Sequence, residues 1–114
     1  MEDDVWEPFY LCKAMAERFV LHPRWELRHG GALALRRLMG CFSAAFPDSF
    51  CSWVCSQLVK VMARDRFSDF QGDRVVAPVR EAAAQALAVS LCATAEDYSF
   101  SVLQTLLKLS LIHI

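Results

Sequence analysis

The sequence predicts an all-α chain of about five helices that pair into helical hairpins. Three observations support this prediction. Apolar side chains recur at steps of three and four residues in several segments, which is the spacing of one helix face. No segment alternates convincingly between apolar and polar residues, and the pair Val75 and Val76 is too short to count as a strand. Two helical segments can also be superimposed as an internal repeat.

The first helix is expected over residues 6–21. Pro8 is tolerated in its first turn, because a proline there removes no hydrogen bond that the helix needs. The helix should end at His22, since the residue before Pro23 is driven out of the α region. The apolar face consists of Phe9, Leu11, Cys12, Met15, Ala16, Phe19 and Val20.

A second helix is expected to start directly after this break and to run to about Met39. It contains Gly30 and Gly31, and each glycine costs about 1 kcal/mol relative to alanine in a helix interior. This cost suggests that the helix passes close to another stretch of backbone. Gly40 is the expected C-cap of the helix.

Residues 41–50 contain Pro47 and are predicted to form a connection. Asp48 or Ser49 is the expected N-cap of a third helix over about residues 50–64. Trp6, Trp25 and Trp53 are expected in the core.

Residues 65–73 form the most polar internal stretch and are predicted to be a loop that two aromatic residues, Phe67 and Phe70, anchor. The clearest helix follows at about residues 77–92, and a fifth is expected over residues 99–107.

The repeat aligns residues 25–35 with residues 77–87 and places Arg28 on Arg80, 52 residues apart. This offset exceeds the ~40–47 residues of HEAT and armadillo repeats, and the long loop at residues 65–73 would account for the excess. The other matched pairs are Gly30 and Gly31 with Ala82 and Ala83, Ala34 with Ala86, and Leu35 with Leu87.

Small residues at matching positions let the inner helices of successive hairpins approach closely, and the arginine can lie across the inter-repeat surface and bond to carbonyls or a carboxylate. The pattern of Val79 and Arg80, followed by Ala83, Ala86 and Leu87, resembles HEAT inner helices. The sequence thus predicts a HEAT/armadillo-like helical-hairpin solenoid. Its hairpins would cover about residues 6–39 and 50–92, with a third starting at residue 99.

Composition limits the classes of function. Of the 114 residues, 55% are hydrophobic and 22% are charged, and the net charge is −1. These values argue against disorder and against a general nucleic-acid surface. No apolar run approaches the ~18–20 residues of a membrane span. The first residues are acidic where a secretory signal is basic, so the five cysteines are expected to be free thiols in a reducing compartment.

Two motifs resemble one particular family. Residues 25–30 read W-E-L-R-H-G, which resembles the W-E-x-R-H-G motif of the TATA-binding protein-associated factor 172 family (the B-TFIID ATPase). Residues 65–70 read D-R-F-S-D-F and residues 73–81 read D-R-V-V-A-P-V-R-E, which resemble a second segment of that family. Leu27 stands where the family often has valine. The resemblance covers about residues 6–108.

The resemblance implies a nuclear scaffold that has TATA-binding protein as its partner. In this family an N-terminal HEAT array grips TATA-binding protein, and a C-terminal motor removes it from promoter DNA. This chain has no G-x-x-x-x-G-K-[ST] phosphate loop, so it is not expected to be an enzyme. No cofactor, membrane or small-molecule substrate is implied, and DNA contact is expected only in the parent complex. The alternative is a generic HEAT adaptor in transport or another complex.

The motif residues are expected to have structural roles at the repeat interface, whereas the polar loop is a candidate contact for a partner. The repeat-motif residues are Trp25, Glu26, Arg28, His29, Gly30, Gly31, Pro78, Val79, Arg80 and Glu81. The loop residues are Arg66, Phe67, Asp69 and Phe70.

Three groups of side chains also allow a more specific functional interpretation. Cys51 and Cys55 share a helix face and could be half of a metal site with His22, His29 or Cys41, but buried thiols are the simpler interpretation. His29 could be a general base, although no nucleophile motif accompanies it. A positive cluster could meet DNA phosphates or an acidic segment, or belong to a mixed solvated surface. It consists of Arg24, Arg28, Arg36 and Arg37.

The last six residues, 109–114, read L-S-L-I-H-I. They resemble the translation of a transposase mosaic-end adapter used in sequencing libraries. We expect them to be a non-native tail after Lys108, and the alternative is a natural splice variant that ends in an apolar tail.

Overall fold

Helices form most of the computed structural model, which describes residues 4, 6–65, 69–71, 74–92, 94 and 104. The α-helices within these residues are α1 (Trp6–Ala14), α2 (Trp25–Phe42), α3 (Asp48–Arg64) and α4 (Pro78–Leu91). A π-helical turn, η2 (Met15–Phe19), continues α1, and a short 3-10 turn, η3 (Ser43–Ala45), follows α2. The predicted all-α class is confirmed.

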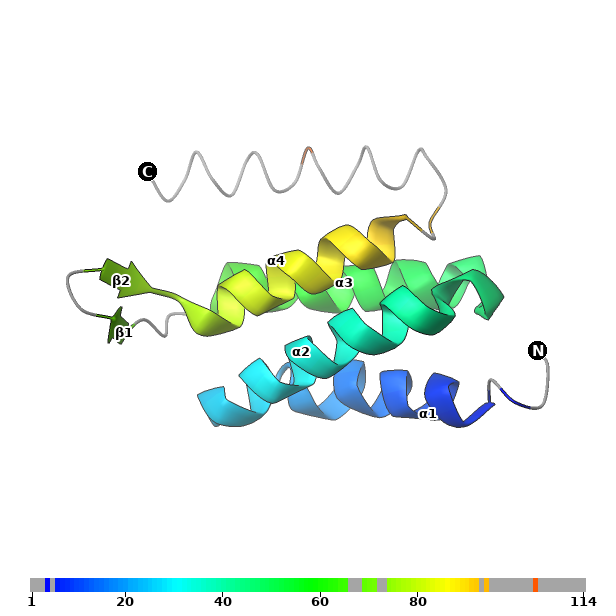
Figure 1. Cartoon of the computed structure of the whole chain (residues 1–114), viewed down its shortest axis with the longest axis horizontal. Coiled ribbons are helices and arrows are strands. Elements are labelled where there is room, and N and C mark those ends of the chain that lie inside the picture. The colour runs from blue at the N-terminus through cyan, green and yellow to red at the C-terminus, as the bar shows by residue number, and fades with distance from the viewer. Residues whose placement is uncertain are drawn as a thin grey trace.

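The helices pack so that the two repeat-related helices are neighbours. The last helix, α4, packs against both α2 and α3, while α2 also packs against α1 and η2 (Figure 1). The buried core draws on all of these elements, and its largest fully buried side chains include Leu35, Leu58 and Leu87. Trp25 and Trp53 are partly buried against this core, but Trp6 is 41% exposed, so its expected core position is wrong.

The periodicity predicts one continuous first helix, but the structure divides it into α1 and the π-helical turn η2. At η2 the Val20 N–H donates to the Met15 carbonyl at 3.0 Å, one residue farther back than in an α-helix. The buried Gln57 amide of α3 donates to the Ala16 carbonyl at 2.8 Å within this turn. A side chain from a distant helix thus bonds to the π-turn backbone, and the local apolar pattern carries no sign of that bond.

Two expected helix ends differ from the structure. Gly40 is not a C-cap, because α2 continues to Phe42 and Gly40 lies inside the helix. Neither Asp48 nor Ser49 is the N-cap of α3, since the helix begins at Asp48 and the extended Pro47 precedes it without a side-chain cap. Asp48 instead occupies the first turn, where a carboxylate interacts favourably with the helix dipole.

A short hairpin interrupts the predicted loop. Strands β1 (Asp69–Gln71) and β2 (Arg74–Val76) pair antiparallel, with Phe70 opposite Val75. The sequence predicts no strand and a loop throughout residues 65–73, and both expectations are wrong where β1 and β2 form. Strands of three residues are too short for alternation to reveal, and cross-strand backbone pairing stabilises them instead.

The expected fifth helix, at residues 99–107, lies outside the described residues except for Gln104, and so does the tail at 109–114. No helix in the described part of the chain is both long and apolar enough to cross a membrane.

Candidate functional site

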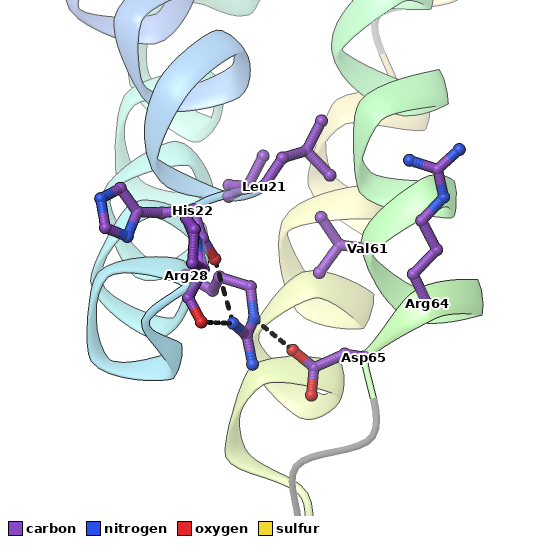
Figure 2. A pocket seen from close by; sticks show the side chains of 8 residues that line it. Leu21, His22, Arg28, Val61, Arg64 and Asp65 are labelled. Carbon is purple, nitrogen blue, oxygen red and sulfur yellow. Dashed lines mark hydrogen bonds and ion pairs between the residues drawn. The ribbon is translucent and has the colours of Figure 1, made fainter.

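Arg28, on the first turns of α2, reaches across the molecule to the end of α3. Its Nε donates to Oδ2 of Asp65 at 2.5 Å. Its Nη1 donates to the carbonyls of His22 at 3.0 Å and Pro23 at 2.8 Å (Figure 2). The Asp65 side chain is 1% exposed and that of Arg28 is 19% exposed. A carboxylate buried to this degree needs a cation beside it, because desolvation of an unpaired charge is strongly unfavourable.

The repeat-equivalent arginine, Arg80, binds the same residue at a different group. Its Nε donates to the main-chain carbonyl of Asp65 at 2.8 Å, and its Nη2 donates to the same oxygen. Asp65 is the C-cap residue of α3, where a cation favours the carbonyl end of the helix dipole. The expectation of arginines that bond a carboxylate or carbonyls thus matches both residues. Sequence reasoning missed Asp65 itself, which it had assigned to the loop.

A pocket of about 360 Å³ lies beside this junction. Leu21 and Val61 face each other across it, and the Arg64 side chain extends away from Asp65 (Figure 2). Arg28 and Asp65 neutralise each other at its edge. The pocket therefore offers no unpaired charge from this ion pair for catalysis.

The remaining motif residues on α2 have separate surroundings. The rings of Trp25 and His29 lie 6.1 Å apart and tilted, and both residues are partly buried. Glu26 is exposed and pairs with Arg24 at 2.8 Å. Hydrogen bonds from its own backbone N–H and from Arg24 hold the pKa of Glu26 below its usual value. These contacts position the first turn of α2 and bring no nucleophile to His29.

The motif residues of α4 match their counterparts on α2 only in part, since Ala82 is buried whereas Gly30 is exposed. Pro78 is the first residue of α4, Val79 is fully buried, and Glu81 is exposed in the first turn. The small pair Ala82 and Ala83 is buried in the core.

The glycine pair of α2 behaves asymmetrically. A Cβ on Gly31 would lie 2.8 Å from Phe19 Cβ and 3.2 Å from the Val20 nitrogen. A Cβ on Gly30 would meet nothing within 4 Å. The expected close backbone approach therefore exists at Gly31, against η2, and is absent at Gly30.

The structure describes only part of the candidate partner loop, and it divides the positive cluster between different surroundings. Asp69 and Phe70 lie in β1, while Arg66 and Phe67 fall outside the described residues. The four arginines separate into two pairs with different surroundings. Arg24 and Arg28 pair with carboxylates. Arg36 donates to Gln85 Oε1 at 2.5 Å, and it lines a groove with Arg37 on the surface between α2 and α4.

The cysteines form no recognisable metal site. Across the described ranges no group of three or more His, Cys, Asp or Glu side chains could hold a metal ion. Cys12, Cys51 and Cys55 are buried free thiols, whereas Cys41 and Cys92 are exposed. Desolvation by burial, with a smaller contribution from Cys51, raises the pKa of Cys12 and of Cys55 to about 12. Burial likewise raises the pKa of Cys51.

Thiol labelling of the folded chain should therefore give two classes. At pH 8, Cys41 and Cys92 are expected to react rapidly with a chromogenic disulfide reagent. The three buried thiols should react only after urea unfolding, because they are both inaccessible and protonated. Mass spectrometry of the labelled peptides checks the assignment, and rapid labelling of Cys12 in the folded chain would contradict it.

The described residues thus define an all-α protein in which Arg28 and Arg80, at equivalent positions of the sequence repeat, both bind the buried Asp65. Neither a family profile nor a solved structure matches the chain. Curated relatives do. Mot1 of Schizosaccharomyces pombe is 33% identical over 91% of this chain, and human TATA-binding protein-associated factor 172 is 34% identical over 95%. Saccharomyces cerevisiae MOT1 is 36% identical over 63%.

The chain therefore belongs to the family of TATA-binding protein-associated factors. It spans only about 6% of the length of the fission yeast and human proteins.

Proposed function

We propose that this chain is a scaffold segment of a nuclear transcription regulator, that it engages TATA-binding protein, and that it helps to remove that protein from promoter DNA. The similarity over 91–95% of the chain to proteins named as TATA-binding protein-associated factors supports the proposal. In this proposal the segment does no chemistry. It holds a shape, and any ATPase belongs to another part of such a protein.

The proposed scaffold is a HEAT-like array. In it, α1 with α2 and α3 with α4 form two successive hairpins, and the third begins at residue 99. The adjacent packing of α2 and α4 supports this arrangement. So does the convergence of Arg28 and Arg80, which occupy equivalent repeat positions, on Asp65.

A binding assay tests the partner. The tagged 114-residue chain should retain TATA-binding protein on a resin, whereas an unrelated helical-repeat protein of similar charge should not. A folded chain, verified by circular dichroism, that retains no more TATA-binding protein than this control would contradict the proposal. Selective retention of a transport factor instead would favour the generic adaptor. Promoter DNA alone should not be retained, because DNA contact is proposed only in the parent complex.

A further inference from the structure

The exposed junction of α2 and α4 contains a groove of about 500 Å³. The two helices lie side by side (Figure 1). Arg36 and Arg37 stand on the α2 side, and small residues, Gly40 on α2 and Ala88 on α4, line it as well. A Cβ at Gly40 would lie 3.5 Å from Val89 Cγ1, so the helices approach to ordinary van der Waals contact there. The groove is thus a shallow, small-residue surface beside two cations.

The charges of this groove differ from those elsewhere on α2. Arg24 and Arg28 have carboxylate partners, whereas in the described part of the chain no carboxylate pairs with Arg36 or Arg37. Arg36 donates to the neutral Gln85 amide, and none of the described residues that line the groove is acidic. Both arginine residues are exposed. They keep donors available for carboxylates, which guanidinium groups bind in bidentate geometry.

We propose that this groove binds an acidic protein segment that places one aliphatic side chain between α2 and α4. Carboxylates of the segment would bind Arg36 and Arg37, and the aliphatic side chain would cover the surface at Ala88 and Val89. DNA fits the groove less well, because duplex binding is dominated by the neutralisation of phosphates, and this site provides two cations on a chain of net charge −1. The inference does not depend on whether the chain engages TATA-binding protein.

Fluorescence anisotropy tests the proposal with the full chain. The probe is a short fluorescein-labelled peptide of glutamate and aspartate with one central leucine, and a second peptide carries serine in its place. The leucine peptide should bind more tightly, because only leucine gains from the apolar surface. Equal affinity of the two peptides, or no binding of either, overturns the proposal.

Charge-reversal variants locate the site. The double variant Arg36→Glu with Arg37→Glu should weaken binding of the leucine peptide by about tenfold or more, since it opposes like charges. The double variant Arg18→Glu with Arg64→Glu changes the net charge equally at exposed residues outside the groove, and it should alter affinity by less than about twofold. An equal loss of peptide affinity in the two double variants would show that only the net charge attracts the peptide, and it would overturn the proposal.

Two further readouts are independent of charge. Ala88→Phe fills the groove without changing charge, and it should weaken the leucine peptide while preserving the helical circular dichroism. In a Cys92→Ser background, Cys41 at the groove is the one exposed cysteine, and the bound peptide should slow its labelling. Tighter binding of a random DNA duplex, lost in the same Arg36 and Arg37 variant, would identify a polyanion surface and overturn the proposal.

Discussion

Asp65→Asn is expected to lower the free energy of unfolding by about 3 kcal/mol, the lower end of the range for breaking a buried ion pair. The substitution leaves the Arg28 guanidinium without its counter-charge at a place where the partner side chain is 1% exposed. The loss stays near the lower end because the Arg28 side chain is 19% exposed and keeps its bonds to two carbonyls. Urea unfolding of the full chain, followed by circular dichroism, measures this quantity.

The exposed ion pair on the same helix provides a matched control. Glu26→Gln breaks the Arg24–Glu26 pair, which has the same chemistry at the surface, and should change the free energy of unfolding by less than about 1 kcal/mol. If the Asp65 and Glu26 variants both lower the free energy of unfolding by less than about 1 kcal/mol, the Asp65 carboxylate does not hold the hairpins together.

Combined substitutions separate the two roles of Asp65. Arg28→Met and Asp65→Asn together should lower the free energy of unfolding by less than the sum of the two single effects. Each single substitution leaves one charge without its partner, whereas the double substitution removes both charges. Arg80 binds the carbonyl, which asparagine retains, so Arg80→Met and Asp65→Asn should be closer to additive. Strong coupling between Arg80 and the Asp65 carboxylate would contradict this division.

The helices were predictable because their signals are local. The apolar spacing lies within each helix, and Pro23 and Pro78 stand at or next to helix ends. The matched arginines identified the repeat. The acceptor of Arg28 was not predictable, since Asp65 lies 37 residues away and only the packing of α3 brings it close. The same reasoning applies to Gln57, which bonds the backbone of η2 from 41 residues away. Long-range polar contacts leave no periodic pattern in the sequence.

The groove between α2 and α4 shows the same limit. Arg36 and Arg37 belonged to a predicted positive cluster of four, but sequence could not tell which arginines would meet carboxylates. The fold assigns Arg28 to Asp65 and Arg36 to Gln85, 49 residues away. Only this assignment distinguishes neutralised cations from those that remain available to a partner.

Adjacent glycines give an equally sharp test of packing. Gly31→Ala should lower the free energy of unfolding by about 2–3 kcal/mol, within the range observed for overpacking. Its Cβ would lie 2.8 Å from Phe19 Cβ and within 3.3 Å of two backbone atoms, so η2 must move away from α2. The backbone of η2 cannot yield as the end of a flexible side chain could, and the strain outweighs alanine's better helix propensity.

Gly30→Ala should have the opposite sign. Gly30 is exposed within the same helix, and an added Cβ meets nothing within 4 Å. The remaining effect is the smaller loss of backbone conformational entropy on folding, which should raise the free energy of unfolding by about 0.5–1 kcal/mol. The two variants add the same methyl group to neighbouring residues, so helix propensity cancels in their comparison. Thermal and urea unfolding of both variants decide the matter, and a shift of the same sign in both would show that α2 does not press on η2 at Gly31.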